Sequence, residues 1–120
     1  MRRATAIKWW VAQVRQGGGM RIEDVRDLLA EYDDVREKGT SELPGWYVRD
    51  RLVARQLDGD SVLVRADFDA RERLLEDHPG TFSLPPSMEA HQKVVVELGR
   101  AEATAVRRAL AEAVELQRER

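Results

Sequence analysis

The sequence contains no cysteine and no run of about 18 apolar residues. Without cysteine the chain can form neither a disulfide nor a thiolate zinc site, and it has no thiol nucleophile. This composition suits a reducing compartment, so we expect a cytoplasmic protein. The lack of a long apolar run predicts that the chain does not span a membrane.

Signatures of catalysis and metal binding are missing as well. The sequence has no G-x-x-x-x-G-K-[ST] phosphate loop, no G-x-S-x-G and no H-E-x-x-H. Asp58-Gly59-Asp60 is too short for a calcium loop. His78 is expected to close a helix, and His91 lies in a polar loop where it could line a small-ligand pocket with Glu89. We therefore expect no enzymatic activity, no metal and no cofactor.

Acidic residues are missing only from the start of the chain. Its charged residues before Met20 are all basic, namely Arg2, Arg3, Lys8 and Arg15, so the rest carries 16 basic against 22 acidic residues, a net charge of -6. That sign is wrong for gripping a phosphate backbone by bulk charge. A nucleic-acid role would need a local basic patch.

The chain divides at three glycines, Gly17 to Gly19. Residues 1–19 are predicted to be a basic extension, either a basic amphipathic helix that touches membrane or nucleic acid, or a segment upstream of a true start at Met20. Residues 20–120 are predicted to be a single domain, since 42% apolar residues in a chain of this length suffice for one core.

Apolar periodicity within residues 20–120 predicts an α+β fold. Ile22, Val25, Leu28, Leu29 and Tyr32 mark a first helix, and residues 33–45 read as a polar linker that ends in a Leu-Pro-Gly turn. Three strands follow between residues 46 and 66. A second helix starts with an Asp69–Glu72 capping box and ends before Pro79, and a short strand at 81–84 precedes a strand at 93–98. A last helix from about residue 100 carries its buried stripe on Val106, Leu110, Ala113, Val114 and Gln117.

The register of the three strands follows from two assumed tight turns. A two-residue loop at Asp58-Gly59 pairs Arg55 with Val62, and a turn at Asp50-Arg51 pairs Val48 with Val53. One sheet face then carries Trp46, Val48, Val53, Leu57, Val62, Val64 and Ala66, with Arg55 as a charged residue at its rim. The other face carries Tyr47, Arg49, Leu52, Ala54, Gln56, Leu63 and Arg65.

This order of elements, with MRIEDVRDLLAEYDDV, GTSELPGWYVRDRLVARQ and especially ERLLEDHPGTF, resembles the MmcQ/YjbR-like family over residues 20 to about 117. The resemblance implies α-β(3)-α-β(2)-α order, with an antiparallel sheet that has its helices packed on one face. It also implies DNA binding through a "double wing" of hairpins. The sequence departs from the family pattern at Asp50-Arg51, where Gly-Lys is usual, and lacks aromatics near Lys93 and Val114.

The residues chosen as a candidate nucleic-acid site are Tyr47, Arg49, Arg51, Arg55 and Arg65. An aromatic ring can stack on a base while guanidinium groups pair with phosphates. Two other interpretations stay open. The arginines can simply solvate a half-exposed sheet face, or the same face can form a homodimer or partner interface with Leu52, Ala54 and Leu63 at its centre.

Overall fold

The computed structural model describes residues 19–40 and 42–119. All but the last residue of the predicted N-terminal extension, residues 1–19, therefore lies outside the described part of the chain. The elements follow in the order α2 (Ile22–Leu29), β2 (Val35–Gly39), β3 (Pro44–Val48), β4 (Arg51–Gln56), β5 (Ser61–Arg65), α3 (Phe68–Asp77), β6 (Phe82–Ser83), β7 (Lys93–Glu97) and α4 (Ala103–Arg118). Two short 3-10 helices, η1 (Pro86–Met88) and η2 (Leu98–Arg100), flank β7.

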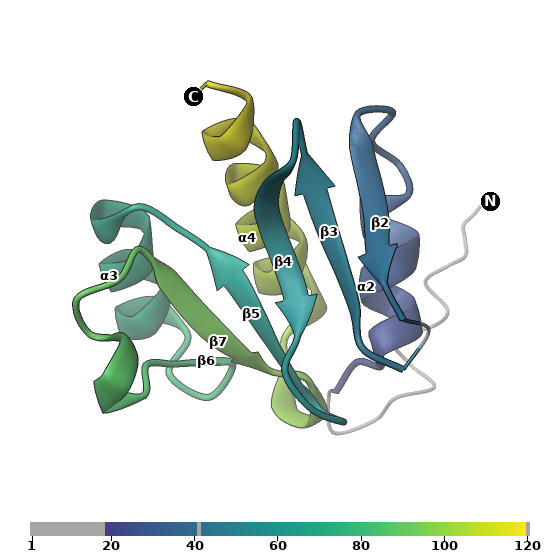
Figure 1. Ribbon diagram of the computed structural model, residues 1–120. Coiled ribbons are helices and arrows are strands. Elements are labelled where there is room, and N and C mark those ends of the chain that lie inside the picture. The colour runs from purple at the N-terminus through teal and green to yellow at the C-terminus, as the bar shows by residue number, and fades with distance from the viewer. Residues whose placement is uncertain (1–18, 41, 120) are drawn as a thin grey trace, which may run out of the picture.

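The six strands form one antiparallel sheet in the order β2-β3-β4-β5-β7-β6. In the view of Figure 1 the sheet lies in front of α2 and α4, and α3 lies beside the ends of β5 and β7. The predicted α+β class and antiparallel sheet are confirmed. No helix in the described part of the chain is long and apolar enough to cross a membrane.

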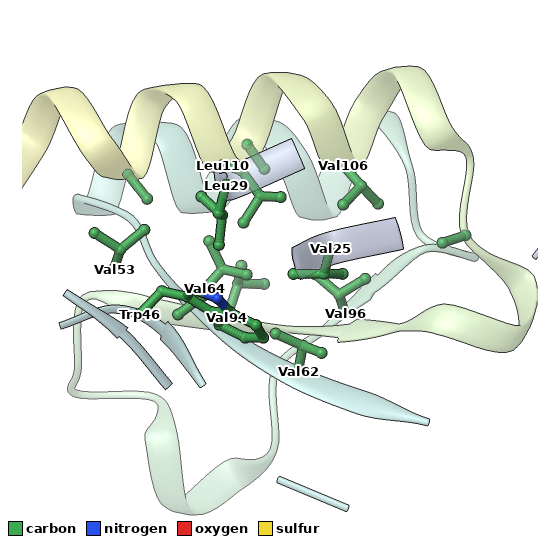
Figure 2. Close-up of a cluster of buried hydrophobic side chains, with 14 of the residues drawn as sticks. Val25, Leu29, Trp46, Val53, Val62, Val64, Val94, Val96, Val106 and Leu110 are labelled. Carbon is green, nitrogen blue, oxygen red and sulfur yellow. The ribbon is translucent and has the colours of Figure 1, made fainter. Parts of the chain in front are cut away.

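The core lies between the sheet and the helices. Val25 and Leu29 of α2 and Val106 and Leu110 of α4 pack against strand residues that include Trp46 (Figure 2). Every residue of the stripe predicted on α4 is buried. Burial of each such aliphatic side chain contributes about 1.5–3 kcal/mol, so this stripe fixes which face of the sheet the helix covers.

One strand was missed in the sequence. The segment predicted to be a linker contains β2, with the sequence VREKG, which pairs along the edge of the sheet with β3. Four of its five residues are exposed, so it lacks the apolar alternation that marks a half-buried strand. Charged edge strands of this kind protect a sheet from pairing with another chain. The observed order is therefore α-β(4)-α-β(2)-α.

The predicted register of the hairpins was wrong by one or two residues. Arg49 and Asp50 both have positive φ, 53° and 65°, and form the two-residue loop between the paired residues Val48 and Arg51. Val53 is then an extra residue in a bulge, because Trp46 pairs with Ala54 and Tyr47 with Leu52.

The loop between β4 and β5 is also longer than predicted. The carboxylate of Asp58 accepts hydrogen bonds from the backbone N–H groups of Asp60 and Ser61, which holds a four-residue loop at residues 57–60. Arg55 consequently pairs with Leu63 rather than Val62, and it faces away from the core.

Of the two ends of α3, one differs from the sequence interpretation and one agrees with it. The cap of α3 is Asp67, whose Oδ1 accepts from the N–H of Ala70 at 2.8 Å, so the predicted Asp69–Glu72 capping box was wrong. His78 is the C-terminal cap of α3 as predicted, and its Nδ1 lies 3.4 Å from a carboxylate oxygen of Glu102.

A buried arginine holds the polar loop that precedes β7. Arg71 of α3 is 7% exposed and donates to the carbonyl oxygens of Glu89 and His91, both at 2.8 Å, while its guanidinium pairs with Glu72. The loop that carries His91 is therefore fixed through its backbone.

Candidate nucleic-acid interface

One face of the sheet carries none of the α-helices α2, α3 and α4 and is called the helix-free face below (Figure 1). Trp46, Val62, Val64, Val94 and Val96 point into the core, and since side chains alternate along a strand, the residues between them point the other way. The strand residues on this helix-free face are Arg36, Lys38, Gly45, Tyr47, Leu52, Arg55, Ser61, Leu63, Arg65, Ser83, Lys93, Val95 and Glu97.

The charge of this helix-free face is strongly uneven. Five of its strand residues are basic and one, Glu97, is acidic. The Glu97 carboxylate accepts hydrogen bonds from the hydroxyls of Ser61 and Ser83 at 3.3 and 3.2 Å. Within residues 19–40 and 42–119, Arg36, Arg55 and Lys93 make no ion pair.

Tyr47 lies against Gly45 on this face. A β-carbon at position 45 would stand 3.2 Å from Cε1 and 3.4 Å from the hydroxyl oxygen of the Tyr47 ring, so the ring occupies the space that a side chain would fill. A glycine in a strand normally weakens it by about 0.5–1 kcal/mol. Here an aromatic ring from the same strand covers the glycine backbone.

Two cations flank this pair of residues. Lys38 pairs with Gly45 on one side and Arg55 pairs with it on the other, which places their Cα atoms about 10 Å apart. The Lys38 Nζ lies 5.2 Å from the centroid of the Tyr47 ring and also forms an ion pair with the exposed Asp50. The Lys38 ammonium lowers the pKa of the Asp50 carboxyl through this hydrogen bond.

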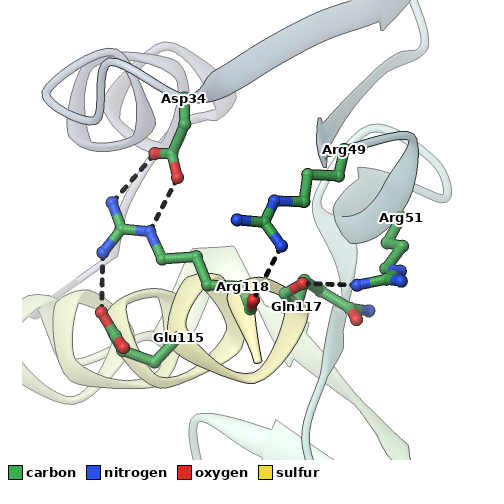
Figure 3. Close-up of polar contacts among 6 residues, drawn as sticks. All are labelled: Asp34, Arg49, Arg51, Glu115, Gln117 and Arg118. Carbon is green, nitrogen blue, oxygen red and sulfur yellow. Dashed lines mark hydrogen bonds and ion pairs between the residues drawn. The ribbon is translucent and has the colours of Figure 1, made fainter. Parts of the chain in front are cut away.

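The residues predicted from the sequence fall into two groups. Tyr47, Arg55 and Arg65 lie on the helix-free face, where Arg65 Nε donates to the carbonyl of Gln92 at 3.0 Å. Arg49 and Arg51 lie instead at the end of α4, where their guanidinium groups donate to the carbonyls of Arg118 and Gln117 (Figure 3). The structure thus does not bring the five together.

The carbonyl groups at the C-terminal end of α4 explain why the side chains of Arg49 and Arg51 lie away from the helix-free face. The last carbonyls of a helix lack partners within the helix and carry the negative end of its dipole, so guanidinium groups bind there. The side chain of Gln117, 3% exposed, donates in return to the carbonyl of Leu52. The β3–β4 hairpin is thereby docked on α4.

A second set of contacts, the ion pairs of Arg118, lies at the same end of the molecule. Arg118 makes a bidentate pair with Asp34 at 2.7 and 2.9 Å and a further bond to Glu115 (Figure 3). The hydrogen bond from Arg118 holds the pKa of Asp34 below its ordinary value, and the same pairing raises the pKa of Arg118. The Arg118 and Asp34 side chains are 36% and 42% exposed, so water screens the pair and it contributes little to stability.

Sequence reasoning missed Arg36, Lys38 and Lys93. The first two belong to β2, which was interpreted as a linker, and the third stands alone at the start of β7. The available signal was the alternation of Arg36 and Lys38, which predicts two cations on one face once β2 is assigned as a strand.

Of the three apolar residues proposed for a dimer interface, only Leu52 is partly exposed on this face. Ala54 faces the core, and Ala54 and Leu63 are each 0% exposed. Val95, which pairs with Leu63, is 3% exposed. This leaves the helix-free face with little exposed apolar area, whereas the centres of stable protein interfaces are apolar.

Other surface features are less suited to a site. A groove of about 400 Å³ between α3 and α4 is lined by alanine and leucine side chains together with charged residues. Its two arginines, Arg73 and Arg108, both pair with Glu112. Within residues 19–40 and 42–119, no group of three His, Asp or Glu side chains lies close enough to hold a metal ion.

The chain matches no family model and no curated protein. It is similar in structure to the Deinococcus radiodurans protein DR2400, whose solved structure is described as a DUF419 domain. The two superpose with a TM-score of 0.64 at 19% sequence identity, over 85% of this chain and 80% of that one. A likeness at this identity shows the fold alone.

Proposed function

We propose that the protein binds nucleic acid through the helix-free face of its sheet, as a divergent member of the MmcQ/YjbR-like family. The observation that carries the proposal is the segregation of charge. Five cations and one carboxylate occupy the strand positions of this face, in a protein whose residues from Met20 onward have a net charge of -6.

The available donors support contacts to phosphate. Arg36, Arg55 and Lys93 make no ion pair within the described residues, so a phosphate can bind them without displacing a carboxylate. Phosphate contacts carry no sequence information, and their strength falls as salt rises. The proposed activity is therefore weak, salt-dependent and indifferent to sequence.

A titration of labelled DNA with the full chain at two salt concentrations tests the proposal. The test variant carries Arg36→Gln and Arg55→Gln. Its control carries Arg73→Gln and Arg107→Gln, which remove the same charge from exposed helix positions whose partners are carboxylates. We expect the test variant to bind more weakly and its salt slope to fall by about one for each phosphate contact removed.

The control variant should bind as the unmodified protein does. Equal losses in both variants would mean that only the total charge matters. In that case the helix-free face would not be the binding site.

A further inference from the structure

The two hairpin tips are poorly suited to enter a groove of duplex DNA. A DNA groove accepts a projecting helix or two-stranded ribbon. The β3–β4 tip is docked on α4, where Arg49 and Arg51 donate to the last carbonyls of the helix. The β4–β5 tip carries Asp58 and Asp60, which phosphates on both sides of a groove would repel.

The helix-free face carries an aromatic ring, on which the stacked bases of a duplex cannot pack. The Tyr47 ring is half-buried against Gly45, with Lys38 and Arg55 on the neighbouring strands. Bases in a duplex are stacked on one another, and their flat surfaces are not available to a side chain. Bases in a single strand can turn out and stack on an aromatic ring, while the adjacent phosphates pair with nearby cations.

From this geometry we infer that the ligand of the helix-free face is single-stranded nucleic acid, with one base stacked on Tyr47 and flanking phosphates bound by Lys38 and Arg55. This inference rests on the proposed function and adds the class of nucleic acid to it. Lys38 is half-exposed and its partner Asp50 lies on the surface, so a phosphate can replace that partner at little cost.

The experiment compares three ligands of equal length by fluorescence anisotropy, using the full chain. They are a single strand of about 12 nucleotides, the same strand with abasic sites, and the duplex with its complement. The abasic strand keeps every phosphate and removes the bases. We expect the single strand to bind roughly tenfold more tightly than the abasic strand, as the loss of one stacked base predicts.

Two variants assign this difference to the ring. Tyr47→Phe should keep the preference for the single strand over the abasic strand. Tyr47→Ala should bring the affinity for the single strand down to that for the abasic strand and leave the affinity for the duplex unchanged. The same strand made as RNA shows whether the face distinguishes the two sugars.

Equal binding of the single strand and the abasic strand by the unmodified protein would overturn the inference, as would an equal loss for single strand and duplex in Tyr47→Ala. The proposed function would still stand if the Arg36→Gln, Arg55→Gln variant bound all ligands more weakly. If that variant bound them as the unmodified protein does, the proposed function itself would fail.

Discussion

Gly45 and Tyr47 form the smallest unit of the proposed site. The ring lies where a side chain at position 45 would be, and a β-carbon there would press against Cε1 at 3.2 Å and against the Arg55 β-carbon at 3.4 Å. The close fit means that one methyl group can displace the ring. It also explains why a glycine stands at the second position of β3.

We predict that Gly45→Ala separates binding from stability. Alanine suits a strand better than glycine by up to about 1 kcal/mol, which offsets the contact with the ring, so the free energy of unfolding should change by less than about 1 kcal/mol. Affinity for single-stranded DNA should fall several-fold because the ring is tilted. Denaturant unfolding and anisotropy titration measure the two quantities.

Gly59→Ala is the matched control, since a β-carbon there meets nothing within 4 Å. It should leave affinity unchanged. Unaltered affinity in Gly45→Ala as well would show that the position of the ring does not matter for binding.

Docking of the β3–β4 hairpin on α4 is the main feature at the scale of elements. The buried side chain of Gln117 donates to the carbonyl of Leu52 beside the bulge, and the backbone carbonyl of Gln117 accepts from Arg51. A backbone carbonyl left without a partner in a buried place costs about 1–3 kcal/mol. Gln117 therefore stabilises a hairpin whose bonded residue, Leu52, lies 65 positions earlier in the sequence.

We predict that Gln117→Ala lowers the free energy of unfolding by about 1–3 kcal/mol. Arg107→Ala on the exposed side of the same helix should change it by no more than about 0.5 kcal/mol. Urea denaturation followed by circular dichroism measures both. A Gln117→Ala variant as stable as Arg107→Ala would mean that water satisfies the Leu52 carbonyl and that the hairpin does not need this contact.

The sequence predicted those elements whose apolar pattern is strong. The stripe on α4 and the β-prone run at Lys93–Glu97 place these elements correctly. The pattern fails at β2 because an edge strand with four exposed residues has no alternation to read. It fails at the hairpins because Arg49 and Asp50 adopt positive φ without a glycine. It fails there also because the Asp58 carboxylate holds a longer loop by accepting hydrogen bonds from the N–H groups of Asp60 and Ser61.

The candidate site was predicted only in part, because strand alternation places some of its residues while others depend on the register and on contacts distant in sequence. Tyr47 and Arg65 follow from alternation alone, whereas the face of Arg55 depends on the register that was misplaced. The docking of Arg49 and Arg51 on α4 is a contact between residues more than 60 positions apart in the sequence, and no local pattern reveals it.

The whole molecule separates its charges. The acidic excess lies mainly on the helices and the loops, while the strand positions of the helix-free face carry a basic excess. A polyanion approaching such a molecule is repelled from most directions and attracted to one, which orients the encounter. The overall negative charge is therefore compatible with nucleic-acid binding at this one face.

Mapping the contact surface tests this account most directly. Amide chemical shifts of the full chain are recorded while an unlabelled single strand is added at low salt. The account predicts that the largest changes fall on the helix-free face, at Lys38, Gly45, Tyr47 and Arg55. It predicts little change at Arg107 on the exposed side of α4 or at Glu112 in the groove between α3 and α4. Changes concentrated on α3 and α4, or no changes at any concentration reached, would contradict it.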